Sequence, residues 1–104
     1  MNKLDGVWNI TVHTFIGDQF SIHTYLVEGD VLTGKVKDKG NGNETAILDG
    51  KIDGSKFSYQ FELKIPIGKM KFTLEGEISE DGATIKGKSK NAMGKFDFSG
   101  IKST

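Results

Sequence analysis

Hydrophobic and polar residues alternate along most of this chain, in short runs separated by glycine-rich turns. The stretch GVWNITVHT near the N-terminus is typical, because Trp8, Ile10 and Val12 recur at every second position with polar residues between them. A period of two places successive side chains on opposite faces of a β-strand. No run shows the period of a helix. The pattern therefore predicts an all-β protein.

Eight such runs can be distinguished, and the turns between them are rich in glycine, aspartate and asparagine, which tolerate a positive φ. We expect strands at residues 6–15, 19–27, 31–38, 44–53, 56–65, 68–79, 83–91 and 94–102. Eight strands joined by tight turns predict an antiparallel up-and-down meander, and eight twisted strands close into a small β-barrel. With 104 residues, the chain is expected to form a single domain over residues 1–104.

Reading each run at period two separates an interior face from an outer face. The predicted interior residues are Trp8, Ile10, Val12, Phe20, Ile22, Thr24, Leu26, Leu32, Val36, Ala46, Leu48, Ile52, Phe57, Tyr59, Phe61, Leu63, Met70, Phe72, Leu74, Ile78, Ile85, Ser89, Phe96 and Phe98. Several glycines, among them Gly34, Gly50 and Gly76, fall on the same face. There they are expected to make room for neighbouring rings and to allow the sheet to coil.

A two-residue turn at Asp81–Gly82 fixes the register of its hairpin and places Ile78 opposite Ile85 inside the barrel. By the same reasoning, Gly50 is expected opposite Tyr59. Strand partners share a face. The outer face should then bring opposite charges together at Glu77 and Lys86, Glu75 and Lys88, Asp97 and Lys88, and Glu62 and Lys71.

Composition narrows the function classes. The chain has no cysteine, so it can form neither a disulfide nor a thiolate metal site. Fourteen basic residues, all lysine, balance fourteen acidic ones, and a neutral chain without arginine is a poor candidate for binding nucleic acid. The N-terminus carries no signal-peptide pattern, and no apolar run approaches the roughly 20 residues that span a bilayer. We therefore expect a cytoplasmic protein with no membrane partner.

Candidate catalytic and metal-binding residues are few. The KGNGN stretch at residues 39–43 lies between two predicted strands, so it is interpreted as a hairpin loop rather than a phosphate loop, which leads into a helix. Asp38 and Glu44 flank it as a conceivable acid/base pair, although solvated carboxylates are the simpler interpretation. His13 and His23 are expected on the outer face, without the third ligand of a zinc site. We expect no enzyme activity, no metal and no cofactor.

The opening Gly6-Val7-Trp8, at the start of an eight-stranded meander, resembles the lipocalin-like calycins and the streptavidin-like barrels. In those families such a tryptophan lies at the closed end of a barrel that carries a small ligand. The chain departs from both patterns. Lipocalins pack an arginine against this tryptophan, and none is present here. Biotin-binding barrels have an asparagine two residues after it, where this chain has Ile10. The resemblance implies a small relative without biotin binding.

Two hypotheses remain for the function. The first is a barrel that binds a small apolar or aromatic molecule, with Tyr59 as the polar anchor. The ligand-binding residues would be Trp8, Phe20, Thr24, Tyr59, Phe61, Phe72, Ser89 and Phe98. The second is a structural or protein-interaction module with a filled core. The outer face of the first four strands is predicted to be poor in charge and to form a homodimer interface, with Val7, Tyr25, Val27, Val31 and Ile47 at its centre.

Overall fold

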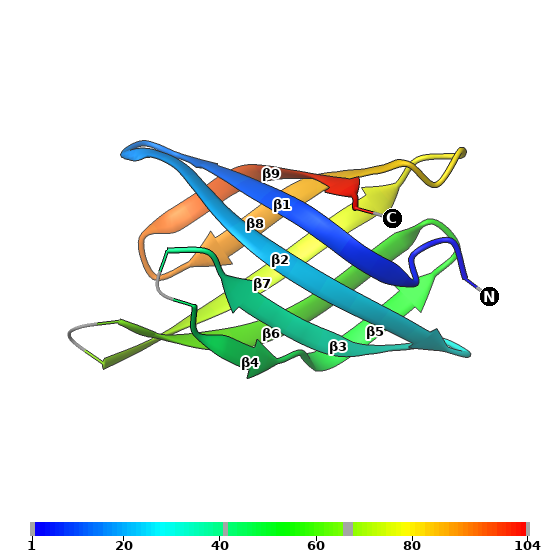
Figure 1. The fold of residues 1–104 in the computed structure, drawn as a ribbon, viewed down its shortest axis with the longest axis horizontal. Coiled ribbons are helices and arrows are strands. Elements are labelled where there is room, and N and C mark those ends of the chain that lie inside the picture. Colours follow the sequence, from blue (N-terminus) through cyan, green and yellow to red (C-terminus); the bar gives the residue numbers. More distant parts are fainter. Residues whose placement is uncertain (1, 41, 66–67, 104) are drawn as a thin grey trace.

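The computed structural model describes residues 2–40, 42–65 and 68–103, and the described part of the chain contains antiparallel strands and no helix (Figure 1). The strands are β1 (Gly6–Thr14), β2 (Gly17–Glu28), β3 (Val31–Asp38), β4 (Glu44–Ala46), β5 (Leu48–Asp53), β6 (Lys56–Ile65), β7 (Gly68–Ile78), β8 (Thr84–Asn91) and β9 (Gly94–Lys102). The predicted all-β class is confirmed. Two predicted turns fall partly outside the described residues, at 41 and at 66–67.

The strands close into a barrel in meander order. β1 pairs with both β2 and β9, and β2 also pairs with β3, so the sheet has no free edge at that point. β4 and β5 are two pieces of one interrupted strand, because both pair with β3 and β5 continues to β6. The barrel therefore has the eight strands that the sequence predicts. Figure 1 shows both termini at one end, with the β1–β2 and β8–β9 turns at the other.

The predicted register of the C-terminal hairpins is confirmed. Ile78 pairs with Ile85, and both are buried. On the outer face every predicted opposition of charge occurs in the register: Glu77 with Lys86, Glu75 with Lys88, Lys88 with Asp97, and Glu62 with Lys71. Lys88 forms an ion pair with Asp97, whereas Glu75 is ion-paired diagonally with Lys90, at 3.3 Å between carboxylate and ammonium.

The predicted orientation of the second strand is wrong. Tyr25 and His23 are buried inside the barrel, while Leu26 is 49% exposed on the outer face. The reason is the length of the two flanking turns, each of which is one residue shorter than the sequence interpretation assumed. Residues Phe15–Ile16 alone link Thr14 to Gly17, and Gly29–Asp30 link Glu28 to Val31. Removing one residue from each turn changes the parity of pairing with both neighbours and exchanges the two faces of β2.

A second correction concerns the interrupted strand. Ala46 and Leu48 are exposed and Ile47 is buried, the reverse of the prediction. The register shifts between Leu48 and Lys51, and Asp49 within this segment has a φ of 51°. A bulge inserts an extra residue on one strand and redirects the side chains on either side of it. The predicted pairing of Gly50 with Tyr59 is absent, because Gly50 lies within this shift of the β5–β6 register, and Gly50 pairs with Leu32 on β3.

The inward orientation of β2 leads to a stability prediction at Leu26. Its side chain is half exposed on the outer face, so Leu26→Lys is expected to lower the free energy of unfolding by less than about 1 kcal/mol. Urea denaturation of the purified variant measures this. A loss of several kcal/mol would mean that Leu26 lies in the core and that β2 has the opposite orientation.

Inward glycines give the rings their space, as predicted. A Cβ atom placed on Gly76 would lie 2.8 Å from Phe98 and 2.9 Å from Phe57, so a larger residue would collide with both rings. Gly34 likewise lies opposite an aromatic residue, because it pairs with Tyr25. It has a φ of 149°, and a Cβ there would lie 1.8 Å from a backbone oxygen of Thr24. Only glycine fits at such a close approach of two strands.

The interior is filled at one end of the barrel. Trp8 and Leu4 are both completely buried there, and the indole nitrogen of Trp8 donates a hydrogen bond to the Leu4 carbonyl oxygen, 2.9 Å away. The Lys102 ammonium lies 5.5 Å from the centre of the Trp8 ring. This end, where both termini lie, is called the base below. The opposite end, where the β1–β2 and β8–β9 turns lie, is called the mouth.

Candidate ligand cavity

A cavity of about 340 Å³ lies inside the mouth of the barrel. Its residues come from β1, β2, β3, β6, β7, β8 and β9 and from the β1–β2 and β8–β9 turns. The apolar wall consists of Val12, Phe61, Leu63, Met70, Phe72, Leu74 and Phe96. Phe61 and Phe72 are stacked, with ring centres 5.0 Å apart. Other hollows of the described surface lie between charged side chains, such as the groove beside Glu75, Glu77, Lys86 and Lys88. The hollow of about 340 Å³, called the mouth cavity below, is lined mainly by apolar side chains.

Polar side chains form the deep part of the mouth cavity. Ser89, on β8, is completely buried, and its hydroxyl oxygen has no hydrogen-bond partner. Ser21 and His23, on β2, also line the mouth cavity. A buried hydroxyl without a partner costs about 1–3 kcal/mol relative to a satisfied one. A bound molecule that formed a hydrogen bond with the Ser89 hydroxyl would therefore remove this free-energy cost.

His23 connects the mouth cavity to a chain of hydrogen bonds through the core. Its Nε2 atom is hydrogen-bonded to Ser21 Oγ at 2.9 Å, and its Nδ1 atom to Tyr59 Oη at 2.5 Å. Tyr59 Oη is in turn hydrogen-bonded to Tyr25 Oη. Since a neutral imidazole has one N–H, one ring nitrogen donates and the other accepts. The whole chain of hydroxyls is thus oriented by the tautomer of His23.

Burial sets the charge of this chain. Loss of hydration lowers the pKa of His23 from its ordinary 6.5 to about 3, so the ring is neutral at physiological pH. Burial also raises the pKa of the Tyr25 and Tyr59 hydroxyls well above 10. The deep part of the mouth cavity therefore presents uncharged donors and acceptors.

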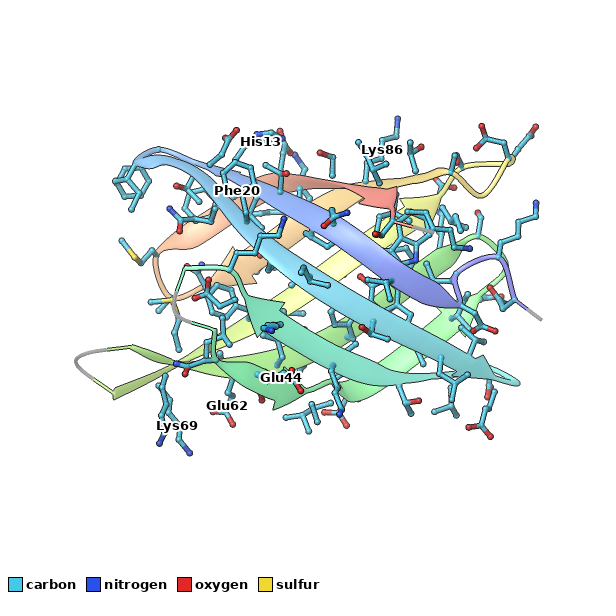
Figure 2. The ribbon with its side chains drawn as sticks, viewed as in Figure 1. His13, Phe20, Glu44, Glu62, Lys69 and Lys86 are labelled. Atoms are coloured by element: carbon cyan, nitrogen blue, oxygen red, sulfur yellow. The ribbon has the colours of Figure 1, made fainter. Side chains whose placement is uncertain are left out.

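The turns at the rim of the mouth cavity carry exposed apolar side chains, while Thr14, Gln19 and Asn91 add uncharged polar groups to the lining. Phe15 and Ile16, in the β1–β2 turn, are 70% and 71% exposed, and Met93 in the β8–β9 turn is also exposed. Lys64 and Asp38 contribute one charge of each sign. In Figure 2 the side chains labelled His13, Glu62, Lys69 and Lys86 lie around the outside of the barrel. A ligand that enters the mouth cavity would therefore pass both apolar and polar side chains.

Four of the eight predicted ligand-binding residues line the mouth cavity, and four do not. Phe61, Phe72 and Ser89 line the mouth cavity, as proposed from the sequence, and Phe20 contributes at the rim while remaining 53% exposed. The other four do not line it. Trp8 and Phe98 are buried in the filled part of the core, Tyr59 is bonded to His23 and Tyr25, and Thr24 is exposed on the outer face. The prediction that Thr24 is an interior residue is wrong, and Tyr59 lies in the interior as predicted but outside the lining of the mouth cavity.

Sequence reasoning missed the contribution of β2 to the mouth cavity. His23 was expected on the outer face, beside His13, yet only His13 is exposed, where it contacts Asp18 at 2.9 Å. One signal was available. Gly34 and Tyr25 are partners, and inward glycines elsewhere in this barrel face large rings. A glycine opposite an aromatic residue would have indicated that Tyr25, and therefore His23, points inward.

The predicted dimer interface loses much of its apolar surface. Tyr25 and Ile47 are 2% and 9% exposed and belong to the core, and Val7 and Val27 are partly buried. Val31 alone among the five predicted residues is clearly exposed, at 50%. The exposed apolar residues on this side of the barrel are instead Leu26, Val31 and Leu48.

Other kinds of site find little support among residues 2–40, 42–65 and 68–103. Within these ranges no three His, Cys, Asp or Glu side chains are grouped closely enough to hold a metal ion. Asp38 accepts a hydrogen bond from the Gly40 amide, and Glu44 contacts Lys35 at 3.8 Å. In the part of the chain that is described, no helix has the length and hydrophobicity needed to cross a membrane.

Together, these features define the class: a small antiparallel up-and-down β-barrel, filled at its base and hollow at its mouth. A solved structure of a redesigned β-barrel has the same fold, with a TM-score of 0.72 over 98% of this chain and 92% of the other. The two sequences are 13% identical, so the similarity establishes the fold alone. No family model and no curated protein matches the sequence.

Proposed function

We propose that this protein is a non-catalytic binding protein that holds a small, largely apolar molecule in the mouth cavity. The observation that carries the proposal is the completely buried, unpartnered hydroxyl of Ser89 inside an apolar cavity of about 340 Å³. Binding sites combine apolar walls with a few well-placed polar groups, in volumes of about 300–1,000 Å³. Such a function would parallel that of the calycin barrels, which the Gly6-Val7-Trp8 opening resembles.

The arrangement of the barrel supports binding at the mouth rather than at the base. Trp8 and Leu4 are completely buried at the base. The interior residues toward the mouth, such as Val12, Leu63 and Phe72, are only partly buried. Burial of apolar surface contributes about 25 cal/mol per Å². A ligand that covered these partly buried walls would therefore gain most of its affinity from them.

A cavity-filling substitution tests the proposal. The probe is prodan, a neutral naphthalene ketone whose emission shifts to the blue in apolar surroundings. Val12 lines the mouth cavity from β1, and Val12→Trp is expected to weaken prodan binding at least about tenfold, because the indole occupies the volume that the probe needs. Asn9→Trp is the matched control, since Asn9 is exposed on the same strand, and it should bind prodan as the wild type does.

A second variant guards against misfolding of the first. Leu63 lines the mouth cavity from β6, across the barrel from β1, so Leu63→Trp should have the same effect as Val12→Trp. Circular dichroism checks that each variant retains its strands. Wild-type prodan affinity in both folded variants, or no blue shift with the wild type, would refute binding in the mouth cavity.

The second candidate function is association of two copies through the outer face of β2 and β3. Leu26 and Val31 are about half exposed on neighbouring strands there, and exposed apolar groups favour an interface when they are contiguous. Light scattering at tens of micromolar distinguishes one subunit from two. A dimer mass that Leu26→Lys reduces to the monomer mass would support this candidate, and a monomer mass for the wild type would exclude it.

A further inference from the structure

The polar atoms in the deep part of the mouth cavity determine which ligand groups can form hydrogen bonds there. Ser89 Oγ has no partner in the protein, and a serine hydroxyl can donate one hydrogen bond and accept others. Ser21 Oγ also lines the cavity and is already bonded to His23. A single ligand oxygen that reaches Ser89 would meet a neutral hydroxyl there.

The charged side chains around the mouth cavity do not favour binding of a charged ligand group in its deep part. Lys64 and Asp38 line the rim with opposite charges, and the Lys64 side chain is exposed. The deep region holds serine hydroxyls and an imidazole that is neutral at physiological pH. A carboxylate placed there would lose its hydration without gaining a cation, which is strongly unfavourable.

Volume and wall chemistry limit the size of the apolar part. An engineered protein cavity of about 150 Å³ holds benzene, and the mouth cavity, at about 340 Å³, has room for roughly two fused rings. Phe61, Phe72 and Phe96 supply aromatic surfaces along its wall. Aromatic pairs contribute about 0.5–1.5 kcal/mol beyond the burial of their area, so flat aromatic ligands suit this wall better than flexible chains do.

Resting on the proposed function, we propose that the mouth cavity selects neutral bicyclic aromatic molecules that carry one hydroxyl or carbonyl oxygen. The oxygen forms a hydrogen bond with Ser89 Oγ, and the rings lie against Phe61 and Phe72. The charged analogue of the same molecule, with a carboxylate in place of the hydroxyl, is disfavoured. Ser89 is therefore the specificity-determining residue of the site.

Displacement of prodan by three compounds of one ring system tests this specificity at pH 7. The compounds are naphthalene, 2-naphthol and 2-naphthoate. Because the added hydrogen bond satisfies a buried hydroxyl, 2-naphthol is expected to bind about tenfold more tightly than naphthalene. 2-Naphthoate should bind at least about tenfold more weakly than 2-naphthol. Equal affinities for naphthalene and 2-naphthol, or tight binding of 2-naphthoate, would overturn the inference.

The variant Ser89→Ala assigns the effect to one hydroxyl. It removes no hydrogen bond present in the free protein, so the fold should be retained, and 2-naphthol should fall to the affinity of naphthalene. Ser99→Ala is the matched control, because Ser99 is exposed on the neighbouring β9 and should leave the preference unchanged. A preference for 2-naphthol that persists in Ser89→Ala would contradict the assignment.

The experiment separates failure of this inference from failure of the proposed function. If 2-naphthoate binds tightly and Lys64→Gln abolishes its binding, the polar group lies at the rim beside Lys64, and only the inference fails. The same holds if no naphthalene compound displaces prodan while Val12→Trp still prevents prodan binding. If Val12→Trp and Leu63→Trp leave prodan binding intact, both the inference and the proposed function fail.

Discussion

Acidification from pH 7 to pH 3 is expected to reduce the free energy of unfolding by about 4 kcal/mol through protonation of His23 in the unfolded chain. Burial lowers the pKa of His23 in the folded chain to about 3, against an ordinary 6.5 in the unfolded chain. Above pH 6.5 both states are neutral at this ring. As the pH falls below 6.5, the unfolded chain takes up a proton that the folded chain excludes until about pH 3, so stability is lost across this window.

The measurement is the free energy of unfolding in urea at several pH values, for the wild type and for His23→Gln. The variant should show a clearly shallower decrease between pH 6.5 and pH 3.5, because its residue 23 does not titrate. Tyr59→Phe is the control. It removes the hydroxyl bonded to His23 Nδ1 and so lowers stability at pH 7, but it retains the imidazole and should keep the steep decrease. Identical pH dependence in wild type and His23→Gln would show that His23 is not buried in neutral form.

Trp8→Ala should lower the free energy of unfolding by about 3–5 kcal/mol, the usual cost of truncating a large buried aromatic residue. Trp8 is completely buried at the base, and its ring nitrogen donates to the Leu4 carbonyl oxygen. Its ring also lies near that of Tyr25, with centres 6.4 Å apart. The truncation opens a void at the base and removes the hydrogen bond that holds the Leu4 segment across it.

Circular dichroism is the appropriate readout for this variant, because Trp8 is the single tryptophan of the chain. Trp8→Phe provides the graded control. It keeps an aromatic ring and loses the hydrogen bond and part of the volume, so it should cost less than Trp8→Ala. Since Trp8 does not line the mouth cavity, the Trp8→Phe protein should bind prodan with wild-type affinity. A cost below about 1 kcal/mol for Trp8→Ala would contradict closure of the base by this ring.

Much of the barrel could be predicted from the sequence because its local signals agree. The alternation of apolar and polar residues gives the strands, and the glycine-containing turns give their order. In the C-terminal half, from β6 to β9, nearly all charged residues lie on one face of each strand. That face must be the outer one, so the sequence defines both the orientation and the register of these strands. Ile78 opposite Ile85, and Lys88 opposite both Glu75 and Asp97, were predicted on that basis and are confirmed.

The mouth cavity could be predicted only in part. Phe61, Phe72 and Ser89 lie on strands whose orientation the charges fix, so they were assigned to the interior correctly. β2 carries apolar residues on both faces, with Phe20 and Leu26 on one and Tyr25 on the other. Period-two alternation identifies two faces of such a strand but does not say which one is inward.

Tertiary pairing settled that choice through the lengths of the turns. With two residues in each flanking turn, β2 can pair with β1 and β3 only when His23 and Tyr25 point inward. The inward orientation is then stabilised by contacts between distant strands, namely the hydrogen bonds to Tyr59 and the space above Gly34. The sequence by itself thus determined an eight-stranded barrel and the orientation of its charged half. The three-dimensional pairing decided the orientation of β2, and with it the neutral polar lining of the mouth cavity, because turn length sets the pairing and partners more than 30 residues away stabilise the inward side chains.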